Sequence, residues 1–169
     1  MNTVSKRILI FDDDDDIQSI CTFILEQDGW QVSVKGSCAG LIDHITAFNP
    51  SVILMDNWIP DEGGVVATQR IKSTEATKCI PVIYFSANSD IESLAKTAGA
   101  DMFLPKPFDL SELIEIINKA YHIRQSVSWQ FNAKHWPELK AKLSDDGGRD
   151  EEGESALKQI FPIRGRNGW

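Results

Sequence analysis

The chain has 169 residues, 42% hydrophobic and 25% charged, a balance that favours a folded protein with a buried core and excludes disorder throughout. Its length allows one ordinary domain and an extension, because domains most often have about 100–150 residues. The net charge of the whole chain is −8, and its source is residues 1–121, which carry 9 Lys and Arg against 18 Asp and Glu, so direct nucleic-acid binding by this part is disfavoured.

Membrane insertion and secretion are both disfavoured by the sequence. No stretch approaches the roughly 18 consecutive apolar residues that a membrane span needs. The three cysteines are odd in number and scattered, so they match neither a disulfide framework nor a zinc pattern. Free cysteine is among the most buried residue types, so we expect Cys21, Cys38 and Cys79 each to be a small core residue. A cytoplasmic location fits these features.

Three apolar runs of 4 residues each are predicted to be buried strands: Ile8 to Phe11, Val52 to Met55 and Val82 to Phe85. Such runs are typical of strands covered on both faces in a parallel sheet. Residues 32–34 alternate in polarity and residues 102–104 form a very short run. These two segments suit the edges of the same sheet.

Stretches with helical spacing of apolar residues lie between and after the strands. They cover residues 17–25, 41–48, 66–71, 94–98 and 110–117. Gly29, Pro50 and Gly99 are expected to end three of these helices, and Asp109 or Ser111 to start the last one. A strand followed by a helix, repeated five times, predicts a doubly wound α/β fold with right-handed crossovers.

Polar residues follow four of the predicted strands. Aspartates occupy positions 12–16 after the first, Asp56 follows the third, Ser86 the fourth and Lys106 the fifth. In doubly wound folds the ligand site gathers at the carboxyl ends of the strands. Clustered carboxylates repel one another, and binding of Mg²⁺ relieves this repulsion. A lysine and a hydroxyl beside them suit a transferred phosphoryl group, with Asp56 as the carboxylate nucleophile.

Each of these residues also has a simpler explanation. An isolated run of aspartates is most often a solvated stretch, but this one follows a buried strand directly and a helix is expected to begin inside it. The positive end of that helix alone explains Asp15 and Asp16. Asp12 and Asp13, nearest the strand, are therefore the predicted metal ligands. Lys106 would be an ordinary surface lysine if it did not stand between two prolines at a strand end.

Taken together, these segments resemble the bacterial two-component response-regulator receiver domain, in its stand-alone, chemotaxis-regulator-like form. The segment KRILIFDDDDDI resembles the family's first strand and acidic pair, and the segment PSVILMDNWIPDEGG resembles its phosphoacceptor strand and the following loop. The segment IPVIYFSA resembles the family's fourth strand with its terminal hydroxyl, and the segment GADMFLPKPFDL resembles its fifth strand with the Lys-Pro turn. All four segments occur in the family's order over about residues 5–122.

The resemblance implies a flavodoxin-like (βα)5 fold with a five-stranded parallel sheet in the order 2-1-3-4-5. The receiver domain would span residues 1–122, and residues 123–169 would form a partly helical or disordered extension without a recognised output domain. The implied function is a switch, not a metabolic enzyme. It would take a phosphoryl group from a histidine kinase or phosphotransfer protein and act on a downstream protein target. A homodimer in this family would use the face around the fifth strand and last helix.

The resemblance also implies a role for each site residue. Mg²⁺ would be held by Asp12, Asp13, Asp56 and the backbone carbonyl of Trp58. Asp56 would accept the phosphoryl group, and Ser86 and Lys106 would each bind one of its oxygens.

Two further expectations concern the switch and the fifth strand. Phe103 matches the aromatic position that turns inward on activation, although plain core packing also explains an aromatic on a short strand. The bond Lys106–Pro107 is expected to be cis.

The loop after Asp56 departs from the family, reading Ile59 to Gly64 as IPDEGG instead of a pattern like Met-Pro-x-Met-Asp-Gly. Trp58 is large for its position and is expected to hinder water, so that the phosphorylated form is long-lived. Three of the five tryptophans, Trp129, Trp136 and Trp169, lie in the extension. They are expected to pack on the domain, or alternatively to meet a partner.

Two other functions remain open at this point. In a Mg²⁺-dependent phosphohydrolase of the haloacid-dehalogenase type, Asp12 would be the nucleophile and Asp14 the acid, and Asp56 would have no role. A receiver-like domain that has lost switching is disfavoured by the intact set of acids, hydroxyl and lysine.

Overall fold

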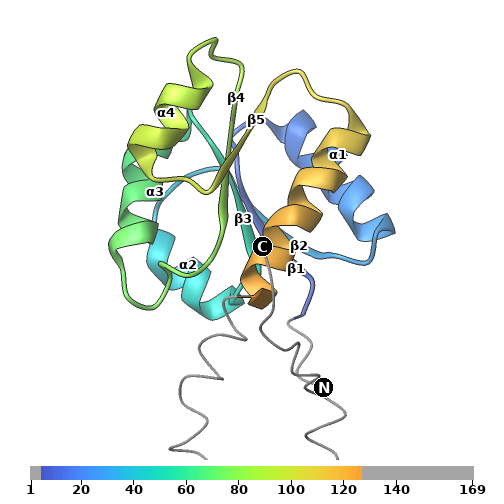
Figure 1. The fold of residues 1–169 in the computed structure, drawn as a ribbon, viewed down its shortest axis with the longest axis horizontal. Coiled ribbons are helices and arrows are strands. Elements are labelled where there is room, and N and C mark those ends of the chain that lie inside the picture. Colours follow the sequence, from blue (N-terminus) through green and yellow to red (C-terminus); the bar gives the residue numbers. More distant parts are fainter. Residues whose placement is uncertain (1–4, 127–169) are drawn as a thin grey trace, which may run out of the picture. The chain divides into compact units, whose positions relative to one another are not determined.

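The computed structural model describes residues 5–126, which lie in one compact unit. Its centre is a sheet of five parallel strands (Figure 1): β1 (Arg7–Phe11), β2 (Gln31–Lys35), β3 (Val52–Asp56), β4 (Val82–Ser86) and β5 (Met102–Pro105). The strand order is β2-β1-β3-β4-β5, as predicted, and the two segments expected at the edges lie there. Most of the predicted extension lies outside the described residues.

Helices cover both faces of this sheet: α1 (Asp15–Gln27), α2 (Leu41–Phe48), α3 (Gly63–Ser73), α4 (Ile91–Ala98) and a last helix, described over residues 110–126. α2, α3 and α4 lie on one side of the sheet, and α1 and the last helix lie on the other (Figure 1). The doubly wound (βα)5 fold is therefore confirmed.

The core has two layers because successive side chains of each strand point to opposite faces. On β4, Val82 and Tyr84 join the layer beneath α2, α3 and α4, whereas Ile83 and Phe85 join the layer beneath α1 and the last helix. All five residues of β3 and of β4 are buried. A central strand of a covered parallel sheet must be apolar on both faces, which is why these two strands read as unbroken apolar runs.

Polar side chains set where two of the helices start. The carboxylate of Asp14 accepts hydrogen bonds from the main-chain N–H groups of Asp16 and Ile17, so α1 begins inside the aspartate run. For the last helix, the carbonyl of Asp109 accepts from the N–H of Leu113 at 3.1 Å, and the Asp109 N–H donates to Glu112 at 2.9 Å. Of the two predicted starts, Asp109 is therefore the correct one.

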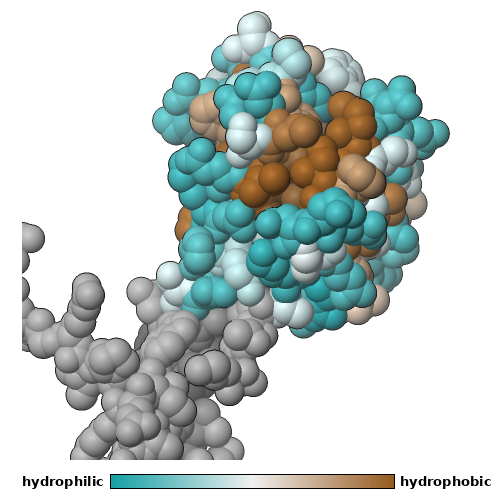
Figure 2. Space-filling view, turned by 90° about the vertical axis from the view of Figure 1, so that its right-hand side faces the viewer, coloured by the Kyte–Doolittle hydropathy of each residue, from teal (hydrophilic) through white to brown (hydrophobic). Residues whose placement is uncertain are grey.

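The surface of the described residues differs from the sequence expectation at one cysteine. Cys21 and Cys38 are buried, but Cys79 is exposed, so the prediction of a core position for Cys79 is wrong. It lies in the connection between α3 and β4, and connecting segments run over the surface. Apolar surface gathers on the side that carries α1 and the last helix (Figure 2). No helix within residues 5–126 has the length and apolar character to cross a membrane.

Candidate functional site

The strand register brings the predicted site residues to one edge of the sheet. Asp56 ends β3 and pairs with Phe85 of β4, and Ser86, the next residue of β4, pairs with Pro105 of β5. Asp12 follows directly after β1, and Lys106 follows directly after β5. Parallel strands all present their carboxyl ends at the same edge, so four separate segments contribute to one site.

Lys106 joins two of these segments through its ammonium group. Its Nζ lies 2.8 Å from Oδ2 of Asp12 and 2.7 Å from Oδ1 of Asp56, and 4.1 Å from the ring centre of Phe85. Both carboxylates are buried, with exposed fractions of 1% for Asp12 and 5% for Asp56. Burial by itself would lower the pKa of Lys106, but the hydrogen bonds to the two carboxylates together raise that pKa above its usual value. Lys106 therefore stays charged at neutral pH.

Three carboxylates meet beside this lysine. Asp12, Asp13 and Asp56 each offer an oxygen, and these oxygens lie within 4.8 Å of one another. Asp12 and Asp56 are buried, whereas Asp13 is exposed. Burial raises the pKa of Asp12, and its hydrogen bonds with Lys106 and with the N–H of Asp14 oppose that rise. Three acids with one adjacent ammonium leave negative charge uncompensated, and carboxylate oxygens are the ligands that Mg²⁺ prefers.

Short hydrogen bonds orient the acidic groups. The N–H of Asp14 donates to Oδ1 of Asp12 at 2.9 Å, and the side-chain amide of Gln18 on α1 donates to the Asp12 carbonyl at 2.5 Å. The N–H of Trp58 donates to Oδ2 of Asp56 at 2.5 Å. Each oxygen of the Asp56 carboxylate thus has one donor, since the other oxygen accepts from Lys106.

The loop after β3 packs tightly against the end of the strand. The N–H of Gly64 donates to the carbonyl of Asn57 at 3.0 Å. A Cβ at Gly64 would lie 2.1 Å from the carbonyl oxygen of Asp56, so no side chain fits there. The hydroxyl of Tyr84 on β4 donates to Oδ1 of Asn57. Burial, with a further contribution from the charge of Asp56, raises the pKa of Tyr84 to about 12, so this hydroxyl stays protonated.

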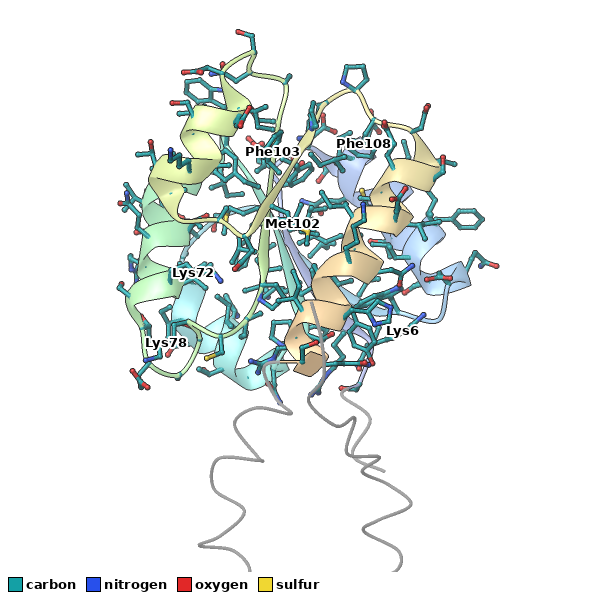
Figure 3. All side chains as sticks on the ribbon, viewed as in Figure 1. Lys6, Lys72, Lys78, Met102, Phe103 and Phe108 are labelled. Carbon is teal, nitrogen blue, oxygen red and sulfur yellow. The ribbon has the colours of Figure 1, made fainter. Side chains whose placement is uncertain are left out.

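Ser86 and Phe103 occupy different environments. Ser86 is 1% exposed, its Oγ accepts from the N–H of Asn88 at 3.1 Å, and its carbonyl accepts from the N–H of Lys106 at 2.8 Å. The side chain of Phe103 is 37% exposed on β5 (Figure 3). The alternative that Phe103 simply fills the core is therefore wrong. The peptide bond Lys106–Pro107 is cis, as predicted.

An open cleft of about 610 Å³ adjoins the acidic cluster. Its lining residues are Asp13, Asn57, Trp58, Ile59, Pro60, Gly63, Asn88 and Leu94. The indole of Trp58 is 77% exposed, so it stands at the surface of this cleft and does not pack in the core.

Several residues of the site were not identified from the sequence. Gln18, Asn57, Gly64 and Tyr84 all contact the segments that carry Asp12 and Asp56. Tyr84 had a signal that could have found it, because it stands two residues before Ser86 in a buried strand and so shares its face. Asn57 lies in a loop and Gln18 on a half-buried helix position, where spacing predicts no partner, and Gly64 is buried in the first turn of α3 but has no side chain to give a signal.

Comparison with known proteins identifies the family. Residues 8–118 match the family model of the response regulator receiver domain. The chain belongs to this family. The receiver domain is 32% identical over 112 residues to the CAI-1 autoinducer sensor kinase/phosphatase CqsS of Vibrio cholerae, covering 64% of this chain and 16% of CqsS. It is 36% identical over 115 residues to the DNA-binding transcriptional regulator NtrC of Rhizobium meliloti, covering 67% of this chain and 23% of NtrC.

Solved structures agree with this assignment. The receiver domain of the sensor histidine kinase PA1611 from Pseudomonas aeruginosa, which has a magnesium ion in its active-site cleft, is similar with a TM-score of 0.64 and 26% identity. The match covers 70% of this chain and 99% of that one. The beryllofluoride-activated NtrC4 receiver domain dimer is similar with a TM-score of 0.64 and 30% identity, over 70% of this chain and 98% of that one. The chain thus spans nearly whole receiver domains but less than a quarter of CqsS or NtrC.

The family match replaces the phosphohydrolase alternative. That alternative assigned the acid role to Asp14, but the Asp14 carboxylate accepts two main-chain hydrogen bonds as the cap of α1. It also gave no role to Asp56, whose carboxylate is bonded to Lys106 within the acidic cluster.

Proposed function

We propose that Asp56 accepts a phosphoryl group and that the protein works as a phosphorylatable switch in two-component or phosphorelay signalling. The observation that carries this proposal is the position of Lys106, whose ammonium lies between the buried carboxylates of Asp12 and Asp56. The ammonium of Lys106 binds one oxygen of Asp56. The acidic cluster adjoins an open cleft through which a phosphoryl donor can approach. In the reaction, a carboxylate oxygen of Asp56 attacks phosphorus, the bond to the donor histidine nitrogen breaks, and that nitrogen keeps the electron pair.

Mg²⁺ is the proposed cofactor, with Asp12, Asp13, Asp56 and the backbone carbonyl of Trp58 as its protein ligands. The donor set supports this, because it supplies carboxylate oxygens from three residues within 4.8 Å of one another. When bound, Mg²⁺ would neutralise negative charge on the phosphoryl oxygens. The residues of the chain do the rest: Lys106 pairs with one phosphoryl oxygen, and Asp12 is held in place by the N–H of Asp14 and by Gln18.

Phosphorylation would be transmitted through Ser86 and Phe103. A phosphoryl oxygen on Asp56 offers the Ser86 hydroxyl a new acceptor and draws it towards the site. The ring of Phe103, now 37% exposed, would then turn inward and change the surface of β5.

The proposed partners are a histidine kinase or phosphotransfer protein and a downstream protein target, with no metabolic substrate. Similarity to a receiver in a sensor kinase and to one in a transcriptional regulator supports this choice. A homodimer through β5 and the last helix is proposed on the example of the NtrC4 receiver dimer. Sedimentation with and without beryllofluoride and Mg²⁺ tests it, and a monomer under both conditions would rule it out.

Phosphorylation with acetyl phosphate and Mg²⁺ tests the central proposal. We expect the intact mass to rise by one phosphoryl group in the wild-type protein and in Asp61→Asn, an exposed aspartate of the same loop. We expect no change in Asp56→Asn or in the absence of Mg²⁺. An unchanged yield of phosphorylated Asp56→Asn would mean that another residue accepts the group.

We further propose that Trp58 makes the phosphorylated form long-lived. Its indole lines the cleft beside Asp13, where water must approach the phosphoryl group. Substitution Trp58→Asn should then speed the loss of phosphate, measured as decay of the phosphorylated mass. An equal or slower decay would contradict the proposal.

A further inference from the structure

Tyr84 is a fully buried aromatic residue of β4, and its hydroxyl has a specific partner. The side chain is 0% exposed and packs in the layer beneath α3 and α4. A phenylalanine would fill the same volume without a polar group to satisfy, so packing alone does not account for the hydroxyl. The hydroxyl donates to Oδ1 of Asn57, the residue directly after Asp56.

This hydrogen bond lies where the pairing of β3 with β4 ends. The last register pair of the two strands is Asp56 with Phe85. Asn57, one residue further on, is attached to β4 through the Tyr84 side chain instead of through the ladder. The hydrogen bond between Tyr84 and Asn57 therefore extends the contact between the strands into the loop that follows Asp56.

Asn57 is also held from the other side of the loop. Its carbonyl accepts from the N–H of Gly64 at 3.0 Å, at the start of α3. Its neighbour Trp58 donates to Asp56 Oδ2 at 2.5 Å. Fixing Asn57 at both its side chain and its carbonyl fixes the direction of the chain on both sides of it, and hence the positions of Asp56 and Trp58.

We propose that Tyr84 is a positioning residue for the phosphoacceptor loop, acting through Asn57 to hold the main chain of residues 56–58 in the geometry that binds Mg²⁺ and accepts the phosphoryl group. This rests on the proposed function for its consequences in the reaction. The hydrogen bond between Tyr84 and Asn57 is present without a metal ion, so its effect on the loop can be tested in the metal-free protein. Tyr84 is also the register partner of Phe103 on β5, so the residue that holds the loop stands beside the residue that is expected to switch.

The matched substitution is Tyr84→Phe, which removes the hydroxyl and keeps the ring. In the metal-free protein we expect amide hydrogen exchange of residues 57–63 to become about three- to tenfold faster, the range to which the loss of one hydrogen bond corresponds. The control is Tyr121→Phe, the other tyrosine of the chain, which packs against Trp30 on the opposite face with ring centres 5.3 Å apart. Exchange of residues 57–63 should be unchanged in this control.

The same variants are then titrated with Mg²⁺ and phosphorylated with acetyl phosphate at saturating Mg²⁺. We expect Tyr84→Phe to weaken the Kd for Mg²⁺ and to slow phosphorylation by a similar factor of about three to ten, with the melting temperature nearly unchanged. If Tyr84 acts through Asn57, adding Tyr84→Phe to Asn57→Ala should cause little further loss. Independent, additive losses would overturn the inference.

Other outcomes are equally decisive. Unchanged exchange in both Tyr84→Phe and Asn57→Ala would show that the bond does not hold the loop. Faster exchange with unchanged Mg²⁺ affinity and phosphorylation rate would show that the loop is held without consequence for the site. Should Tyr84→Phe fold poorly, Asn57→Ala makes the same test with the buried ring intact. Failure of the proposed function would appear separately, as wild-type protein that is not phosphorylated on Asp56.

Discussion

Gly64 has no room for a side chain, because a Cβ there would lie 2.1 Å from the carbonyl oxygen of Asp56. We expect Gly64→Ala to lower the free energy of unfolding by about 1–3 kcal/mol and to displace the end of β3. Urea denaturation measures the loss, and phosphorylation of Asp56 should slow at the same time.

The neighbouring Gly63 provides the control for this prediction. It has a positive φ of 75°, but a Cβ would have its nearest neighbour 3.9 Å away. The cost of Gly63→Ala should therefore come from the left-handed backbone alone, at roughly 1 kcal/mol. A loss for Gly64→Ala no greater than for Gly63→Ala would contradict the steric argument.

Lys106 separates two buried carboxylates, so its removal should have a pH-dependent cost. At neutral pH we expect Lys106→Met to lower the free energy of unfolding of the metal-free protein by roughly 3 kcal/mol, because two unpaired charges remain buried. Burial already raises the pKa of Asp12, and the loss of the ammonium raises it further. A folded-state pKa above the unfolded value means that the folded protein gains relative stability as the pH falls through that pKa.

The difference in the free energy of unfolding between wild type and Lys106→Met should therefore become smaller from pH 7 towards pH 4. Urea denaturation at several pH values measures it against wild type. Lys119→Met, which breaks an exposed pair with Glu115 on the last helix, should show no measurable change at any of these pH values. A deficit that is constant with pH would mean that Lys106 contributes by packing, for example on the ring of Phe85.

At the scale of elements, the start of α1 depends on one aspartate. Asp14→Ala removes the acceptor for the N–H groups of Asp16 and Ile17 and should cost about 1 kcal/mol of stability, measured by urea denaturation. Asp14→Ser keeps a capping oxygen and should restore most of the loss. Phosphorylation of Asp56 should persist in both variants, because Asp14 caps the helix and is not assigned to the metal.

The strands and helices were largely predictable because their apolar spacing reflects burial. The buried runs of β3 and β4 and the alternating edge strand β2 needed only the period of the pattern. Helix starts were less predictable. α3 begins at Gly63 and α4 at Ile91, each three residues before the predicted start. The first turn of α3 starts with two glycines, which carry no apolar signal, whereas Ile91 is buried and fits the helical spacing of Ala95 and Ala98, so the start of α4 could have been predicted.

The candidate site was predictable to the extent that parallel strands end at one edge. That rule alone brought Asp12, Asp56, Ser86 and Lys106 together. It gives no distances and no partners, so neither the bridging position of Lys106 nor the bond from Tyr84 to Asn57 could be derived. Such contacts depend on side-chain rotamers and loop paths, which periodicity does not encode.

At the scale of the whole molecule, the predicted domain boundary at residue 122 falls inside the last helix, which is described to residue 126. The guanidinium of Arg124 on this helix donates to the carbonyl of Cys79 at 3.0 Å. A protein truncated after residue 126 keeps this contact, whereas one truncated after residue 122 loses it.

We expect both truncated proteins to unfold cooperatively, since all five strands and most of the described part of the helices that cover them lie within residues 5–122. The longer one should melt a few degrees higher, as one hydrogen bond and the extra helical turn correspond to about 1 kcal/mol. Calorimetry compares them. Equal melting temperatures would mean that the domain ends at residue 122, as first predicted.

The five consecutive aspartates of this chain have different structural roles. Asp12 is buried beside Lys106, Asp13 faces the cleft, and Asp14 caps α1, which begins with Asp15 and Asp16. A strand fixes one end of the run and a helix fixes the other. The run therefore acts as a spacer of set length. Deleting a single aspartate would leave an acidic segment of nearly the same charge, but each remaining aspartate would be shifted by one position relative to the strand or the helix. The function of this segment therefore depends on the number of its residues as well as on their charge.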